Sequence, residues 1–90
     1  MTDRTTMEAD FRARGLQPHG WSDAPGYTYG WHEHSYRKVL CCVSGSIRFH
    51  TAQGDIQLEP GEWMELPAGT RHSATVGPAG VSCLEAAAPE

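Results

Sequence analysis

A chain of 90 residues is long enough for one domain, and its seven basic and eleven acidic side chains give a net charge of −4 without any basic cluster. We therefore expect no nucleic-acid partner, because phosphate binding depends on clustered lysines and arginines. No apolar run approaches the roughly 20 residues of a membrane span, and the N-terminus does not lead into a signal-peptide apolar region. These features predict a cytoplasmic protein without a membrane partner.

The three cysteines, Cys41, Cys42 and Cys83, agree with that location. Their odd number and irregular spacing argue against a secreted disulfide scaffold. Cys41 and Cys42 are adjacent, so their side chains would face opposite ways on a strand. We interpret all three as small apolar side chains in a core.

The first 24 residues lack strand alternation and are predicted to form an extension that packs on the main domain. Up to Gly15 they carry a threonine cap, early acidic residues and late arginines, which predicts one or two turns of helix. Met7 and Phe11 would share its apolar side, since they are four residues apart. Residues 16–25 contain two prolines and a glycine and are predicted to be irregular.

From residue 27 the pattern changes to a period of two, with a turn signal after each short run. The predicted strands are residues 27–34, 38–43, 46–51, 56–58, 63–66, 72–76 and 81–85. Glycine-containing turns are predicted at 44–45 and 77–80. Short strands between frequent turns predict an all-β antiparallel sandwich or barrel over residues 25–86, with a frayed tail at 87–90.

The strand that begins at Tyr27 would have two contrasting faces. Tyr27, Tyr29 and Trp31 alternate onto one face, and His32 and His34 onto the other. An aromatic face on a small barrel favours a homodimer interface, with a second core layer as the alternative.

Three of the five histidines have a spacing that suggests a metal site. His32 and His34 point to the same side of an extended chain, and His72 follows a Pro–Ala–Gly turn. Imidazole is the commonest protein ligand for mid-row divalent metals, and three of them leave positions open for water or substrate. His19 and His50 are interpreted as hydrogen-bonded structural residues.

These histidines stand in two spaced motifs that resemble those of the cupins, G-x5-H-x-H-x3-E-x6-G and G-x5-P-x-G-x2-H-x3-N. The matching positions are Gly26, His32, His34 and Gly45 in the first motif and Gly61, Pro67, Gly69 and His72 in the second. The resemblance implies a small antiparallel jelly-roll barrel, often dimeric. It also implies one divalent ion on His32, His34 and His72 near the barrel mouth, with iron, manganese, nickel and zinc as the options.

The sequence departs from the motifs at Lys38, where cupins carry a glutamate ligand, and at Val76, where they carry asparagine. A protonated lysine repels a cation and cannot coordinate it. Three arrangements remain open. Three neutral histidines bind the metal while Lys38 turns aside or holds a metal-bound anion. Alternatively, buried Lys38 loses its proton and acts as a base or nucleophile. In the third, no metal binds and the pocket is cationic, for an anionic ligand.

Lys38 is predicted to share its inward strand face with Leu40 and Cys42, and Tyr36 is predicted to line the pocket mouth. As an enzyme, the protein would be a metal-dependent oxygenase or isomerase acting on a small molecule, with Lys38 and Tyr36 as candidate catalytic residues. The alternative is a non-enzymatic ligand-binding or sensor cupin, with or without metal, because the fold alone does not decide the activity.

Overall fold

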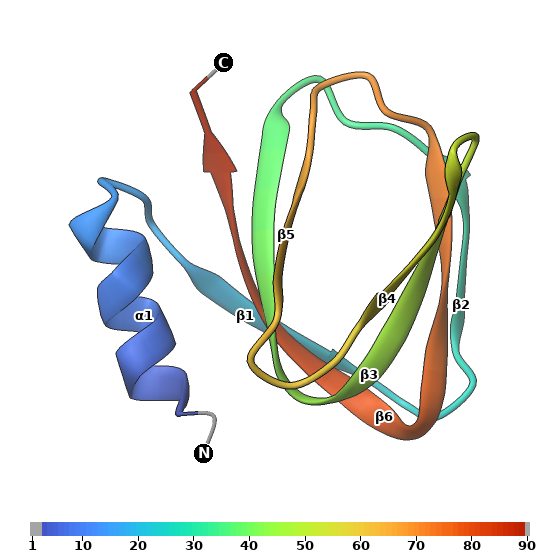
Figure 1. Ribbon diagram of the computed structural model, residues 1–90, viewed down its shortest axis with the longest axis horizontal. Helices are drawn as coiled ribbons and strands as arrows, with labels where there is room; N and C mark the ends of the chain where they lie inside the picture. Colours follow the sequence, from blue (N-terminus) through green and yellow to red (C-terminus); the bar gives the residue numbers. More distant parts are fainter. Residues whose placement is uncertain (1–2, 90) are drawn as a thin grey trace.

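The computed structural model describes residues 3–89. Its elements are α1 (Arg4–Ala13), β1 (His19–Asp23), β2 (Thr28–His32), β3 (Arg37–Thr51), β4 (Gly54–Leu58), β5 (Trp63–Leu66) and β6 (His72–Ala88). The strands curl into a barrel, and α1 lies outside it (Figure 1). This confirms the predicted all-β antiparallel barrel with a short N-terminal helix. Within the described residues, no helix has the length and apolarity needed to cross a membrane.

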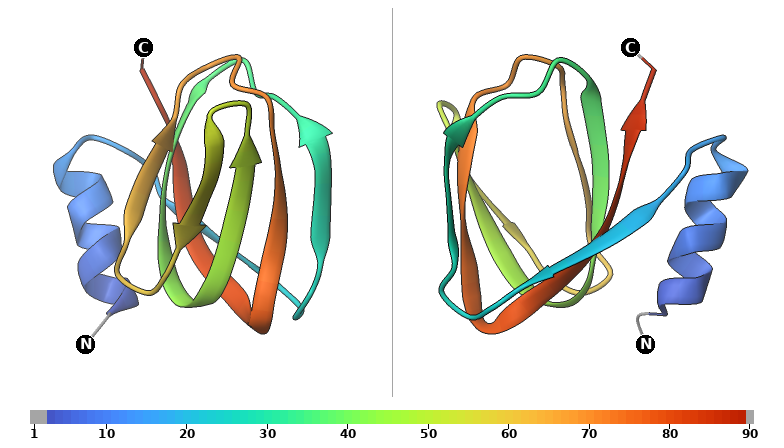
Figure 2. Two further views of the ribbon diagram at one scale, coloured as in Figure 1. Left: turned by 45° about the vertical axis from the view of Figure 1, so that its right-hand side comes forward. Right: turned by 180° about the vertical axis from the view of Figure 1, so that it is seen from behind.

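Two long strands organise the sheet. β6 pairs antiparallel with β1, β2 and β3, and β3 pairs antiparallel with β4 and β5. Each long strand is therefore bent and pairs with different strands along its length. Figure 2 shows this arrangement from two sides. Inside the barrel, the core consists of Leu40, Cys42, Ile47, Phe49, Leu58, Met64, Leu66, Ala74, Val76, Val81 and Cys83.

The turns predicted at 44–45 and 77–80 are wrong, because β3 and β6 are continuous through them. Gly45 adopts a φ of 73°, and a Cβ there would collide with the carbonyl oxygen of Gly80. Gly45 pairs with Val81 and Ile47 with Val76, so residues 77–80 lie opposite Ser46 alone. The glycines thus allow β3 and β6 to bend together where their pairing register shifts, and they do not reverse the direction of the chain.

The N-terminal helix is confirmed and is longer than predicted. Its cap is Asp3, whose Oδ1 accepts a hydrogen bond from the Thr5 N–H at 3.1 Å, where a threonine was predicted. Met7 and Phe11 are buried on the apolar side of α1, as expected. Phe11 packs on Trp63 with ring centroids 4.7 Å apart, so α1 covers an apolar outer face of the barrel.

The prediction of an irregular segment at 16–25 is wrong over residues 19–23, because β1 pairs residue by residue with the C-terminal half of β6, from His19↔Glu85 to Asp23↔Val81. It holds at residues 16–18 and 24–25, which belong to no helix or strand. β1 is mostly exposed, so it shows no apolar alternation, and its backbone pairing decides its conformation. At the other end, Ala88 still pairs with Arg37, so the predicted frayed tail at 87–90 is paired at its start. Residue 90 lies outside the described residues.

The three cysteines are buried and free, as predicted. Cys42 and Cys83 belong to the core inside the barrel, whereas Cys41 packs with the outer cluster beneath α1. The alternation of Cys41 and Cys42 between two faces therefore follows the period of β3.

Candidate metal centre

A bulge in β2 sets the position of the first histidine. Tyr29 pairs with Ala74 and His32 with His72, so Gly30 and Trp31 lie together opposite Ser73. The extra residue places Tyr29 and His32 on the same inward side, although they are three positions apart. The prediction that Tyr29 and His32 occupy opposite faces is therefore wrong. Trp31 remains outside, with 53% of its surface exposed.

The three histidines of the two motifs converge. One ring nitrogen from each of His32, His34 and His72 lies within 4.8 Å of the others. His32 ends β2, His34 lies in the connection to β3, and His72 begins β6. These segments meet at one end of the barrel, where the β2–β3 and β5–β6 connections run side by side (Figure 1). The Gly69 N–H donates to the carbonyl of His34 at 2.8 Å and ties the two connections together.

Hydrogen bonds decide which ring nitrogens face the centre. Nδ1 of His32 lies 2.6 Å from the Gly30 carbonyl, and Nδ1 of His72 lies 2.9 Å from the Thr70 carbonyl. A carbonyl only accepts, so both Nδ1 atoms carry the proton and both Nε2 atoms keep a lone pair. Nε2 of His34 is buried and has no hydrogen-bond partner among the described residues. Two Nε2 lone pairs and an unpartnered third imidazole nitrogen fit a divalent transition metal.

The electrostatic setting favours neutral imidazoles. Burial lowers the pKa of His34, and the nearby charges of Lys38, His32 and His72 lower it further. Burial also lowers the pKa of His72, outweighing its hydrogen bond to Thr70, which acts in the opposite direction. Both side chains are consequently neutral at neutral pH, which is the form that binds metal.

A cavity of about 190 Å³ adjoins the histidines. It is lined by Trp21, Tyr29, His32, Lys38, Phe49, His72, Ala74 and Glu85. The lining is partly aromatic and carries one cation, one anion and two imidazoles. A cavity of this size and composition suits a small polar molecule.

Lys38 faces this cavity, as its strand position predicted, and it is paired. Its Nζ lies 3.3 Å from Oε1 of Glu85, and each side chain is only 11% exposed. Trp21 donates its indole N–H to the same oxygen at 2.7 Å. The pocket is therefore not simply cationic, because Glu85 balances the charge of Lys38.

Sequence reasoning missed Glu85 and Trp21 as cavity residues. The signal for Glu85 was available, since Val81, Cys83 and Glu85 alternate along one strand and Val81 and Cys83 face the inner core. Tyr36, predicted at the pocket mouth, is 37% exposed and does not line the cavity. Its ring lies 5.1 Å from the ring of His34.

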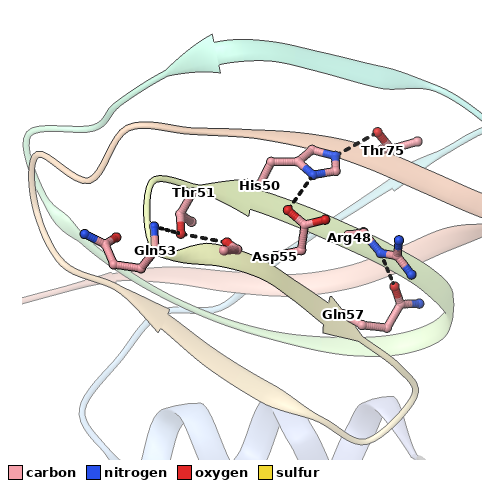
Figure 3. A network of polar contacts seen from close by, with 8 residues as sticks. Arg48, His50, Thr51, Gln53, Asp55, Gln57 and Thr75 are labelled. Carbon is pink, nitrogen blue, oxygen red and sulfur yellow. Dashed lines mark hydrogen bonds and ion pairs between the residues drawn. The ribbon is translucent and has the colours of Figure 1, made fainter.

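The other two histidines stand apart from this group. His50 lies in a network of polar contacts where β3, β4 and β6 meet (Figure 3). Its ring contacts Asp55 at 2.9 Å and Thr75 at 3.1 Å, which agrees with a hydrogen-bonded structural role. His19 is exposed on β1, and its Nε2 lies 3.7 Å from Oε2 of Glu85.

Comparisons with known proteins agree with this geometry. A comparison with the curated proteins finds no match. Among solved structures, a chain from the crystal structures of the DMSP lyases RdDddP and RnDddQII is 32% identical, with a TM-score of 0.75. The match covers 82% of this chain and 38% of that one, so this chain spans well under half of that protein.

Two further structures share the fold. A protein of unknown function from Rhizobium leguminosarum bv. viciae 3841 is 16% identical, with a TM-score of 0.77 over 100% of this chain and 98% of that one. A cupin domain from Bordetella pertussis Tohama I is 24% identical, with a TM-score of 0.65 over 83% and 82%. The family model for the cupin domain matches residues 20–83, most of the chain. Together with the barrel and the two histidine motifs, this match shows that the chain belongs to the cupin superfamily.

Proposed function

We propose that this protein is a metal-dependent cupin that binds and converts a small anionic molecule. The observation that carries the proposal is the convergence of one ring nitrogen from each of three histidines, together with the buried and unpartnered Nε2 of His34. In this proposal His32, His34 and His72 hold one iron, manganese, nickel or zinc ion. Such an ion supplies Lewis-acid chemistry to a carboxylate or carbonyl and leaves positions open for it.

The protein's own residues would shape the rest of the site. Lys38 lines the cavity, and its side chain suits the negative end of a ligand. Glu85 accepts hydrogen bonds from its side of the same cavity. Trp21, Tyr29 and Phe49 give the cavity apolar walls, which exclude water and strengthen these polar contacts. Tyr36 stays a candidate at the outer edge of the site through its contact with His34.

The reaction class is part of the proposal. A chain from DMSP lyase structures is 32% identical to this one, so lyase chemistry on DMSP is the first activity to test. Oxygenase and isomerase chemistry are the other classes that the same metal and cavity support. The buried and unpartnered Nε2 of His34 favours these metal-dependent functions over a metal-free sensor, because an unpartnered buried nitrogen costs about 1–3 kcal/mol unless something binds it.

The test starts from protein purified without a polyhistidine tag. It is incubated separately with each of the four ions, desalted and analysed for metal by mass spectrometry; we expect one ion per chain. DMSP is then added to the loaded protein and followed by proton NMR. Consumption that is absent from the His34→Ala variant supports the enzyme, whereas line broadening without consumption indicates a binding protein. A chain that stays folded and retains none of the ions contradicts the proposal.

A further inference from the structure

A carboxylate reaches the candidate metal cavity from the part of β6 that lies beyond the second cupin motif. Glu85 lies near the end of β6, directly across the ladder from Leu40 of β3. It is 8% exposed and lines the same cavity as His32 and His72. The first motif, in contrast, carries Lys38 at the position where a carboxylate is usual. The site therefore has a cation on β3, where the motif would place an anion, and its anion on β6.

The surroundings of Glu85 hold its side chain in place. Oε1 of Glu85 accepts a hydrogen bond from the indole N–H of Trp21 at 2.7 Å and lies 3.3 Å from Nζ of Lys38. Oε2 lies 3.7 Å from His19 at the exposed edge. Groups from β1 and β3 thus meet a carboxylate from β6. Burying a carboxylate costs several kcal/mol unless it is paired and hydrogen-bonded, and these contacts supply that compensation.

Glu85 and Lys38 face the same cavity as two of the three histidines. Both of these charged side chains line it together with His32 and His72. A metal ion bound to those rings would therefore be attracted by the carboxylate of Glu85 and repelled by the charged amine of Lys38.

We infer that Glu85 takes the place of the missing first-motif glutamate as the negative charge of the metal centre, with Lys38 as its counter-ion. This inference rests on the proposed metal site. Glu85 lies outside the group of three mutually close ligand atoms, so it acts as a neighbour of the ligands and through its charge. An anionic ligand in the cavity would compete with Glu85 for Lys38.

The inference predicts opposite effects for the two partners. Glu85→Gln keeps the side-chain shape and the acceptor for Trp21 but removes the charge, so the affinity for Zn²⁺ should fall about 10- to 100-fold. Lys38→Met removes a repelling charge and should raise the affinity about tenfold. The double variant should return close to the wild type. Glu65→Gln is the matched control, because Glu65 pairs with Arg14 and Arg37 outside the barrel and its loss changes the net charge equally.

The measurement is competition for Zn²⁺ between the metal-free protein and a chromophoric chelator, with circular dichroism to check folding. Opposite shifts in the two single variants and none in Glu65→Gln support the inference. If the wild type binds one Zn²⁺ and the affinity of Glu85→Gln for Zn²⁺ lies within twofold of the wild-type value, the role of Glu85 is overturned and the metal site stands. A folded wild type that binds no Zn²⁺ overturns the proposed metal site together with this inference. Should Glu85→Gln not fold, Lys38→Met decides, since unchanged or weaker Zn²⁺ binding there also overturns the inference.

Discussion

His32 and His72 are cross-strand neighbours on β2 and β6, and their imidazole centroids lie 4.3 Å apart. The two histidine motifs, distant in the chain, meet at this register pair. Their geometry is set by a strand ladder and by the adjoining bulge of Gly30 and Trp31. Sites built on strands hold their side chains more precisely than sites on loops. His34, which follows in a connection, completes the group from a less regular segment.

The first prediction concerns the contribution of His34 to metal binding. His34→Ala removes one of three nitrogens and should abolish most metal retention, since two imidazoles alone hold a mid-row ion weakly. His50→Ala should retain the ion, because His50 lies in the separate polar network with Asp55 and Thr75 (Figure 3). Elemental analysis of both variants after identical loading and desalting checks this. Equal losses from the two variants would contradict the three-histidine site.

The second prediction is a dependence of stability on pH in the metal-free protein. Burial lowers the pKa of His34 and His72 below the 6.5 of an exposed histidine. Between the folded and unfolded values the unfolded chain binds more protons, so the free energy of unfolding rises with pH in that interval. The stability should be complete above about pH 7 and should fall as the pH drops through 6.5. Urea unfolding between about pH 5.5 and pH 7.5 measures it.

The control for this pH effect is a variant with His34→Gln and His72→Gln. Removing both histidines should flatten the slope, because the two imidazoles whose pKa burial lowers are then absent. A slope identical to that of the wild type would show that other groups cause the pH dependence.

Period-two patterns predicted the barrel, and together with the motif spacing they predicted the three histidines and Lys38 of the candidate site. The motif spacing brought His32, His34 and His72 together correctly, because each is fixed to a strand end or a glycine turn. Lys38 was placed correctly on the inward face of β3, since β3 is regular there and its period holds. These predictions depend on the spacing of neighbouring residues along one strand or turn, which can be seen in the sequence itself.

The features that failed depend on contacts between distant segments. β1 has no apolar pattern of its own and forms by pairing with β6. The bulge at Gly30 and Trp31 turns the side chain of Tyr29 inward, and Gly30 within the strand is a weak local signal for it. Glu85 becomes part of the site only through its partners Lys38 and Trp21 on other strands. Each of these needed the register of the sheet, which is a tertiary property.

The third prediction concerns Gly45, whose glycine signal was mistaken for a turn. Gly45→Ala places a methyl group against the Gly80 carbonyl at a φ of 73°. Gly26→Ala is the matched control, with a φ of 75° and nothing within 4 Å of the added Cβ. The control should cost only the left-handed strain of about 1–2 kcal/mol. Gly45→Ala should cost distinctly more, because the paired strands must separate as well. Denaturant unfolding of both variants compares them, and equal costs would show that the bend between β3 and β6 tolerates a side chain.

The last prediction is that the protein forms a homodimer through the aromatic residues that face outward. With Tyr29 turned inward, Tyr27 and Trp31 remain 49% and 53% exposed around β2. Large exposed aromatics are enriched at protein interfaces, and a chain this short gains stability by association. Light scattering at micromolar concentration should give twice the 9.8 kDa of one chain. Tyr27→Ser with Trp31→Ser should lower the mass toward the monomer, whereas Ile56→Ser, at an exposed position on β4, should not. A wild-type mass of 9.8 kDa would reject the dimer.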